Sequence, residues 1–286
     1  MRIYNTCAGT RYVSTNNIKP VSNWNVGAVE GPYEDLDGFM HHPAALAEDL
    51  LANGITAMKI WPFDPIADET RGLSISADQL RKALWPFEEI RKAVGDKIEI
   101  MLEMHSLWNL PTAKKIARAV EPYAPTWYED PIKMNSPQAL GEFARSTSVW
   151  TCASETLGSR WPYKDMLDHN AMDVVMTDLV WAGGLTEGRK IASLAETYHR
   201  PFAPHDCTGP VAFAAAVHMS VCQPNTLIQE SVRAFYKGWY RDLVTEIPRI
   251  ENGYVYPMEG PGLGVELLPS VFERSDLSTR YSEVQK

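Results

Sequence analysis

Three short stretches of sequence decide the fold: IEIMLEMHS at 98–106, TWYEDP at 126–131 and TCASET at 151–156. Each is a strand-like apolar run with a glutamate near its end, and helical sequence separates one run from the next. The glutamates are spaced by 26 residues: Glu103, Glu129 and Glu155. A strand, a helix and two short loops need about that length, and repeated strand–helix units close into a (β/α)8 barrel. The sequence therefore predicts an α/β fold of the TIM-barrel type.

The three glutamates also predict a metal site. In such a barrel the carboxyl ends of the strands meet at one rim, so three carboxylates from successive strand ends would converge there. Without a cation they would repel one another and raise each other's pKa values. A divalent cation that prefers oxygen ligands removes this repulsion. We therefore predict that Glu103, Glu129 and Glu155 bind Mg²⁺.

The same rhythm continues along the chain. Asp178 ends DVVMTD, His205 ends PFAPH and Glu230 ends TLIQE, at spacings of 23, 27 and 25 residues. Upstream, Lys59 lies in ITAMKIWPF, and RIYNTCAG at the N-terminus provides a first strand. Any one of these charges could be a solvated loop residue. Seven ionisable side chains in one register favour a shared site at the rim.

Length and composition fit one barrel. The chain has 286 residues, 45% of them hydrophobic, and roughly 250 residues suffice for such a domain. Pro/Gly/Ser-rich linkers, low-complexity tracts and charge blocks are absent from the sequence. We predict a single domain over 1–286, with a C-terminal extension from about residue 245.

Composition also constrains location and partners. No apolar run approaches 18 residues, the first residues lack a signal-peptide core, and the four cysteines show no CxxC spacing. These features favour a cytoplasmic protein with reduced thiols, away from the membrane and without a zinc site or disulfide framework. The net charge of -9 argues against nucleic-acid binding. It permits an anionic small molecule, because a bound dication sets the local field. Assembly into a homo-oligomer stays open.

Histidines on the rim indicate acid–base chemistry. Asp178 and His205 end neighbouring strands, so the carboxylate can orient the imidazole and raise its basicity. His205 could equally be a loop residue beside Asp206, but its place on the rim favours catalysis. His105 stands two positions after Glu103, on the same side of its strand by period-two geometry, and is a second candidate acid or base.

Two further rim residues have alternative roles. Lys59 can pair with a substrate carboxylate or a metal ligand, or it is a buried lysine that one of the glutamates satisfies. Glu230 can hydrogen-bond a developing oxyanion if it is protonated, or it can position His205.

This pattern resembles the barrel domain of the enolase superfamily, mandelate racemase subgroup. WYEDP at 127–131 and the D-x-x-x-x-GG run at 178–184 are typical of that group. The resemblance implies Mg²⁺ ligands ending strands three to five, an aspartate and a histidine after strands six and seven, and an acidic residue after strand eight. These roles fall on Glu103, Glu129, Glu155, Asp178, His205 and Glu230.

Three departures from the family pattern shape the expected chemistry. Lys59-x-Trp61 replaces the common Lys-x-Lys, so the second lysine, a base, is absent. Glu103-x-His105 replaces the common Asp-x-Asn and resembles the subgroup's sugar-acid dehydratases, in which this histidine protonates the leaving oxygen. Family members also carry an α+β capping domain before the barrel. Because this chain begins at the first strand, we expect that domain to be absent.

The family's shared step is abstraction of a proton α to a carboxylate, giving an enediolate held by Mg²⁺. The resemblance implies that His205, tuned by Asp178, removes the C2 proton of a sugar acid, and that His105 protonates the departing C3 oxygen. If that oxygen is a hydroxyl, the enzyme is a dehydratase that yields a 2-keto-3-deoxy acid. If it is a ring ether, the same step opens the ring and the enzyme is a cycloisomerase.

Two motifs favour the ring-opening version. KIWPFD at 59–64 and HSLWNLP at 105–111 resemble the 3,6-anhydro-galactonate cycloisomerases of the subgroup. Trp61 and Trp108 are expected to pack on the apolar face of a sugar.

Three alternatives stay open. One is a racemase or epimerase of the same family. Another is an aldolase on the same barrel in which Lys59 forms a Schiff base, although this leaves the regularly spaced glutamates unexplained. The third is a barrel without its lid that binds a metal or a partner and has no catalytic activity.

Overall fold

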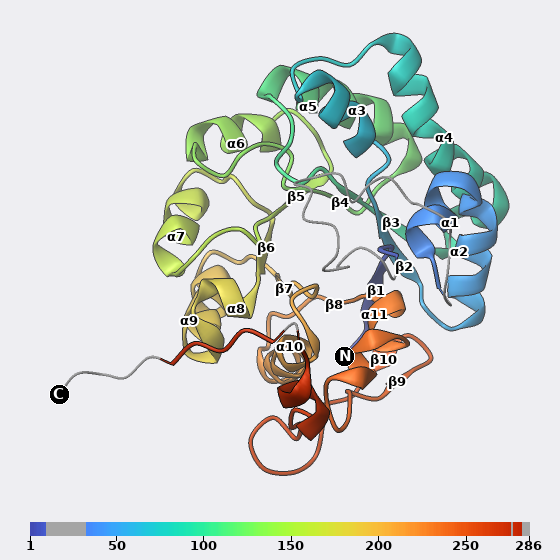
Figure 1. Cartoon of the computed structure of the whole chain (residues 1–286). Helices are drawn as coiled ribbons and strands as arrows, with labels where there is room; N and C mark the ends of the chain where they lie inside the picture. The colour runs from blue at the N-terminus through green and yellow to red at the C-terminus, as the bar shows by residue number, and fades with distance from the viewer. Residues whose placement is uncertain (10–32, 276, 282–286) are drawn as a thin grey trace.

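Eight parallel strands form the centre of the molecule, and helices surround them (Figure 1). The computed structural model describes residues 1–9, 33–275 and 277–281. The strands are β1 Ile3–Thr6, β2 Ala57–Ile60, β3 Glu99–Glu103, β4 Trp127–Glu129, β5 Trp150–Ala153, β6 Val174–Thr177, β7 Phe202–Pro204 and β8 Gln229–Ser231. The order β7-β6-β5-β4-β3-β2-β1-β8 with helices between the strands confirms the predicted TIM-type fold.

The strands nearly close into a barrel. β1 pairs in parallel with both β2 and β8, so the first strand of the barrel is joined to the last. At the remaining seam between β7 and β8, a single bridge joins Phe202 to Thr226, and the Leu227 N–H donates to the Phe202 carbonyl at 2.8 Å. Closure brings the ends of all eight strands to one rim.

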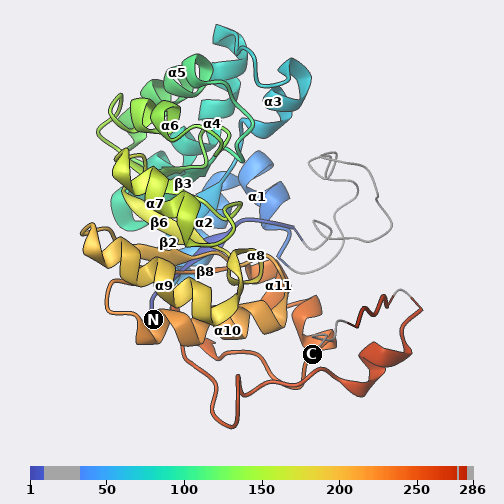
Figure 2. The same ribbon diagram turned by 90° about the vertical axis from the view of Figure 1, so that its left-hand side faces the viewer.

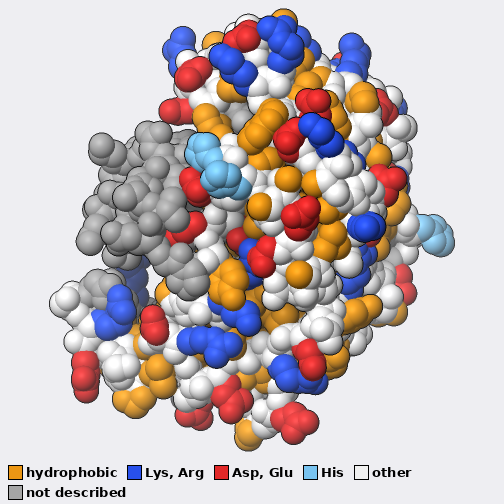
Figure 3. All heavy atoms as spheres, turned by 90° about the vertical axis from the view of Figure 1, so that its right-hand side faces the viewer, with side chains coloured by type: hydrophobic (Ala, Val, Ile, Leu, Met, Phe, Trp, Pro, Cys, Tyr) orange, Lys and Arg blue, Asp and Glu red, His pale blue; other side chains and the backbone are white. Residues whose placement is uncertain are grey.

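Helices follow the strands in turn. They are α1 Asp35–His41, α2 Pro43–Ala52, α3 Asp64–Thr70, α4 Ala77–Val94, α5 Leu110–Val120, α6 Pro137–Ala144, α7 Arg160–Asp168, α8 Leu179–Ala182, α9 Gly184–Thr197, α10 Pro210–Cys222 and α11 Arg233–Tyr236. α4 shows why they form: a capping box of Ser76 and Gln79 starts it, and Phe87 and Ile90 bury its apolar face. Figure 3 shows the face with α1, α2 and α4, where acidic and basic side chains are mixed.

Side chains fill the inside of the barrel below the rim. Tyr4 and Trp127 meet edge to face with ring centroids 5.4 Å apart. Met101, Cys152 and Met176 are fully buried in the same cluster. A second, larger cluster lies between the strands and the helices. Because the interior is packed, polar groups can gather only at the strand ends, as in other barrels of this type.

Short helices mark the rim. In the side view of Figure 2, α3, α8 and α11 lie on the same side of the barrel, and they follow β2, β6 and β8. On the opposite side, a hairpin of β9 Ile250–Glu251 and β10 Tyr254–Val255 contacts the start of the chain. There the Val255 N–H donates to the Met1 carbonyl at 2.8 Å. Within the described ranges, no helix has both the length and the apolarity that crossing a membrane requires.

Candidate active site

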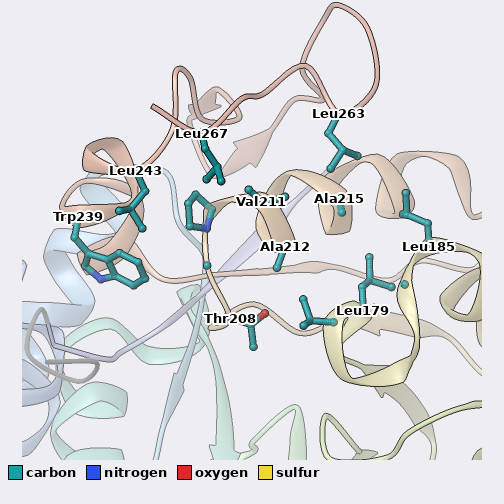
Figure 4. A pocket seen from close by; sticks show the side chains of 14 residues that line it. Leu179, Leu185, Thr208, Val211, Ala212, Ala215, Trp239, Leu243, Leu263 and Leu267 are labelled. Atoms are coloured by element: carbon teal, nitrogen blue, oxygen red, sulfur yellow. The ribbon is translucent and has the colours of Figure 1, made fainter. Parts of the chain in front are cut away.

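A cavity of about 200 Å³ opens at the rim. Its lining residues are Thr6, Ala8, Lys59, Trp61, Glu103, His105, Glu155, Trp181, His205, Cys207, Thr208 and Glu230. Most of the predicted rim residues therefore face one space. Glu129 and Asp178 are not in this lining, but each contacts a residue that is. A second, apolar groove of about 540 Å³ lies between α8, α10 and the C-terminal segment (Figure 4), and Thr208 lines both spaces.

The three glutamates converge as predicted. The parallel register sets Glu103 directly beside Glu129 on β3 and β4, and Glu155 lies two residues beyond the end of β5. One carboxylate oxygen from each lies within 4.8 Å of the others. Glu103 Oε1 accepts the N–H groups of Met104 and His105, whereas the buried Oε2 accepts no hydrogen bond from the described residues and has only an ion-pair contact with Lys59 Nζ at 3.3 Å. An all-oxygen donor set that includes a buried oxygen without a hydrogen bond fits a hard divalent cation such as Mg²⁺.

The electrostatics of this cluster differ in part from the expectation. Burial and the neighbouring Glu103 raise the pKa of Glu129 well above its usual value, as predicted for like charges that share a site. For Glu103 the expected rise is wrong. Burial opposes its ionisation, but His105 and Lys59 outweigh burial and lower the pKa of Glu103. The pKa values of these two neighbouring glutamates are therefore shifted in opposite directions.

Lys59 lies within the acidic cluster. Its side chain is 2% exposed, and Nζ contacts Glu129, Glu230 at 2.8 Å and Glu103 at 3.3 Å. Burial works against the charged form, but Glu129 and Glu230 outweigh it and raise the pKa of Lys59 well above its usual value. A permanently protonated amine is a poor nucleophile, so this environment disfavours the Schiff-base alternative. Lys59 instead combines two of its predicted roles, as a buried lysine and as the partner of two metal-ligand candidates.

Asp178 and His205 form a hydrogen-bonded pair. His205 Nδ1 lies 2.7 Å from Asp178 Oδ2, and both side chains are buried. Asp178 caps α8: its Oδ1 accepts the N–H groups of Val180 and Trp181 at 2.7 and 3.2 Å. Thr208 Oγ1 donates to Oδ2 at 3.0 Å. The carboxylate is thus fixed by three donors besides the imidazole, and it fixes the imidazole in turn.

The second nitrogen of His205 faces acidic residues. Nε2 lies 3.1 Å from Glu155 Oε2 and 4.0 Å from Glu230 Oε2. Burial works against the charged imidazole, but Glu155 and Glu230 outweigh burial and raise the pKa of His205 well above its usual value. A cation held by Glu155 would weaken this effect, because it cancels the nearest negative charge.

His105 reaches the cavity by a different route from the one predicted. β3 ends at Glu103, and His105 and Ser106 adopt φ values of 47° and 59°, so strand alternation does not place this side chain. A left-handed turn does. His105 Nδ1 then lies 2.6 Å from Asp64 Oδ2 at the start of α3. Burial lowers the pKa of His105, but Asp64 and then Glu103 outweigh burial and raise it to about 9.

The same turn separates the two predicted sugar-packing tryptophans. Trp61 lines the cavity and meets the His105 ring edge to face, with centroids 5.5 Å apart. Trp108 is 3% exposed, bridges to Ile132 and is absent from the described cavity lining. The structure therefore does not bring Trp108 to the site.

Trp181 is a site residue that the sequence analysis did not single out. Its ring stacks on His205 with centroids 5.9 Å apart and an interplanar angle of 28°, and it is 50% exposed. The residue lies inside the D-x-x-x-x-GG run, so the signal was in the sequence, but its position relative to His205 depends on α8. Asp64 was also missed, because its partner His105 is distant in sequence.

Glu230 accepts hydrogen bonds at both oxygens. Oε1 contacts Lys59 and the Thr6 hydroxyl, and Oε2 accepts the Asp206 N–H at 3.0 Å. Burial opposes ionisation, but Lys59 and His205 outweigh burial and lower the pKa of Glu230. An ionised, fully buried carboxylate fits a positioning role better than that of a protonated donor.

Comparison with known proteins identifies the family. The sequence profile described as "Enolase C-terminal domain-like" matches residues 42–271, and the chain belongs to this family. D-gluconate dehydratase of Thermoproteus tenax is 32% identical over 231 residues, which cover 81% of this chain and 46% of that protein. D-galactonate dehydratase of Ralstonia nicotianae is 33% identical over 236 residues, covering 79% and 62%. The chain thus spans about half to two thirds of these relatives.

Solved structures place it in the same group. An enolase of the mandelate racemase subgroup from Agrobacterium tumefaciens aligns with a TM-score of 0.79 and 55% identity over 81% of this chain and 63% of that one. A mandelate racemase/muconate lactonizing enzyme from Jannaschia sp. CCS1 aligns with a TM-score of 0.81 and 29% identity, covering 98% and 67%. The resemblance to the enolase superfamily, mandelate racemase subgroup, is confirmed.

Proposed function

We propose that this barrel abstracts the proton α to the carboxylate of a sugar acid and then eliminates the C3 oxygen. One observation carries the proposal: two histidines, each held at Nδ1 by its own carboxylate, line the same cavity as Glu103 and Glu155. His205 is held by Asp178 at 2.7 Å, and His105 by Asp64 at 2.6 Å. Elimination needs a base and an acid in one site, and this arrangement can provide both.

The roles follow from the two environments. His205 accepts the C2 proton at Nε2, because Nδ1 is committed to Asp178. His105 donates a proton to the leaving oxygen, since its pKa of about 9 keeps it protonated near neutral pH. Mg²⁺ at Glu103, Glu129 and Glu155 would neutralise charge that develops on the substrate carboxylate. Lys59 and Glu230 position these groups, and Trp61 and Trp181 present aromatic surface to the sugar.

The class of leaving group distinguishes two versions of the reaction. Relatives named D-gluconate and D-galactonate dehydratase support loss of a hydroxyl, which yields a 2-keto-3-deoxy acid. The motifs at 59–64 and 105–111 support a ring ether, which would make the enzyme a cycloisomerase. A racemase is the second candidate within the family. It needs a competent base on each face of C2, and the resemblance to the family assigns the usual second-base position to Trp61, which cannot accept a proton.

Product analysis in D₂O tests the proposal. The protein is incubated with Mg²⁺ and D-gluconate, D-galactonate or a 3,6-anhydro sugar acid, and products are followed by NMR. We expect a 2-keto-3-deoxy acid from one of these substrates, and no product when EDTA replaces Mg²⁺. Accumulation of C2-epimerised substrate without keto acid would show a racemase or epimerase instead. Metal binding without any turnover or C2 exchange would support a non-catalytic barrel.

A further inference from the structure

A second group of possible metal ligands lies beside the three glutamates. His205, Cys207 and Glu230 each offer one donor atom, and these atoms lie within 4.8 Å of one another. All three residues line the rim cavity. Two follow β7 and the third is on β8, so the parallel neighbours bring them together. Cys207 has no part in the proposed elimination.

The donor types differ from those of the glutamate cluster. A sulfur, an imidazole nitrogen and a carboxylate oxygen are the ligands that Zn²⁺ takes in proteins, usually in tetrahedral geometry. Mg²⁺ prefers oxygen ligands alone. The two clusters therefore favour different cations, although they lie side by side.

His205 already has the orientation of a metal-bound histidine. Ligating histidines usually donate the other ring N–H to a carboxylate, which fixes the tautomer and the ring. Here Asp178 takes Nδ1 at 2.7 Å, and Nε2 faces Glu155 and Glu230. Glu230 is held in turn by Lys59 and by the Asp206 N–H at 3.0 Å. Two of the three ligands are thus fixed in place by hydrogen bonds before any metal binds.

The distances allow one ion to reach all three donors. Zinc bonds of about 2.0–2.3 Å in tetrahedral geometry place neighbouring ligand atoms roughly 3.4–3.6 Å apart. His205 Nε2 and Glu230 Oε2 lie 4.0 Å apart. All three donor pairs lie within 4.8 Å, so each pair must shorten by no more than about 1.4 Å to share one ion.

We propose that His205, Cys207 and Glu230 form a zinc site that inhibits the enzyme. Zinc binding goes beyond the proposed function and does not depend on it. Inhibition rests on the proposed function, because zinc would occupy the His205 nitrogen that acts as the base. The absence of CxxC spacing had argued against zinc. CxxC spacing detects cysteine ligands that are close in sequence, whereas these three ligands come from the ends of two neighbouring strands.

Binding is tested with Co²⁺ as a spectroscopic substitute for zinc, in excess Mg²⁺. Only a cobalt–thiolate bond gives a charge-transfer absorption, so cobalt bound to glutamates alone adds none. We expect the band in the wild type, its displacement by Zn²⁺, its loss in Cys207→Ser and Cys207→Ala, and its retention in Cys222→Ser. Cys222 is the matched control because it is an exposed thiol outside the cavity. Absence of the band in the wild type, or its persistence in both Cys207 variants, would overturn the proposal.

Inhibition is tested separately by zinc titration of the elimination, with each variant normalised to its own zinc-free rate. Loss of one ligand should weaken inhibition by at least about tenfold in Cys207→Ser, while Cys222→Ser stays as sensitive as the wild type. Equal sensitivity of Cys207→Ser and the wild type would refute zinc inhibition through this cluster. A cobalt band in a protein without turnover would support the zinc site and contradict the proposed function alone.

Discussion

The two histidines of the cavity differ in the residues that surround them. His205 has Glu155 and Glu230 near Nε2, whereas His105 is held mainly by Asp64. The cation in the proposed Mg²⁺ site would act directly on Glu155, a ligand beside His205. It would therefore lower the pKa of His205 when it binds. Glu103 and Glu155 also raise the pKa of His105, but its largest raising influence is Asp64, which is not one of the proposed ligands, so His105 keeps more of its proton affinity. This asymmetry is what assigns base and acid.

Removing the acid should separate the two steps. We expect His105→Gln to lower formation of the keto acid by about 10²–10⁴-fold, because expulsion of an unprotonated oxygen is costly. Deuterium exchange at C2 should survive, since His205 is untouched. NMR of the same reaction in D₂O measures both. A parallel loss of exchange and product would show that His105 does not act only on the leaving group.

The Asp64 contact makes a pH prediction. His105 acts in its protonated form, and its pKa is raised to about 9 without a bound cation. Mg²⁺ on Glu103 and Glu155 would lower that pKa, so product formation should decline with rising pH at or below about 9. Glu103 and Glu155 also raise this pKa, and they remain in the variant. In Asp64→Asn the largest of the raising influences is lost, so the decline should begin at lower pH. Identical high-pH limbs in the two proteins would contradict the role of Asp64.

At the scale of elements, the sequence rhythm was enough to find the strand ends. Glu103 and Glu129 end β3 and β4, and Asp178 and His205 directly follow β6 and β7. Strand period and loop length carry that information. The turn at His105 and Ser106 was not predictable in the same way, because its left-handed conformation is imposed by contacts with β4 and α3. For this reason strand alternation does not explain the position of His105, and Trp108 lies outside the described cavity lining.

A close backbone approach fixes that loop. Gly72, two residues after the end of α3, has φ +66°, and a Cβ atom there would lie 1.8 Å from the Leu107 carbonyl oxygen. We expect Gly72→Ala to lower the free energy of unfolding by more than Gly95→Ala does. Gly95 also has positive φ, but its Cβ would meet nothing within 4 Å, so only backbone strain of about 1–3 kcal/mol applies. Urea denaturation of both variants measures the difference. Equal losses would mean that the loop moves aside.

At the scale of the whole molecule, a buried ion pair ties the last strand to the first helix. Arg233, which begins α11 after β8, forms two hydrogen bonds with Asp35 of α1 at 2.7 and 3.1 Å. Asn5 of β1 donates to the same carboxylate at 2.9 Å and accepts the Arg233 N–H at 2.9 Å. These contacts join parts of the chain that are far apart in sequence, so periodicity could not reveal them.

Breaking this pair should destabilise the whole barrel. Arg233→Ala leaves the Asp35 carboxylate buried without its partner, which typically costs about 3–5 kcal/mol of unfolding free energy. Arg81→Ala is the control, because its pair with Asp78 is exposed, and we expect stability close to the wild type. Thermal and urea unfolding report both. A loss in Arg233→Ala no larger than in Arg81→Ala would show that the pair does not stabilise the junction between α11 and α1.

The most direct test of the central claim is solvent-deuterium exchange at C2 of a sugar-acid substrate, compared between the wild type and His205→Asn. Calorimetric titration with Mg²⁺ is the control for an intact glutamate cluster. The account predicts exchange in the wild type with Mg²⁺, no exchange in His205→Asn, and similar Mg²⁺ affinity in both. Exchange that persists in His205→Asn would contradict this account and indicate that His105 or Lys59 is the base.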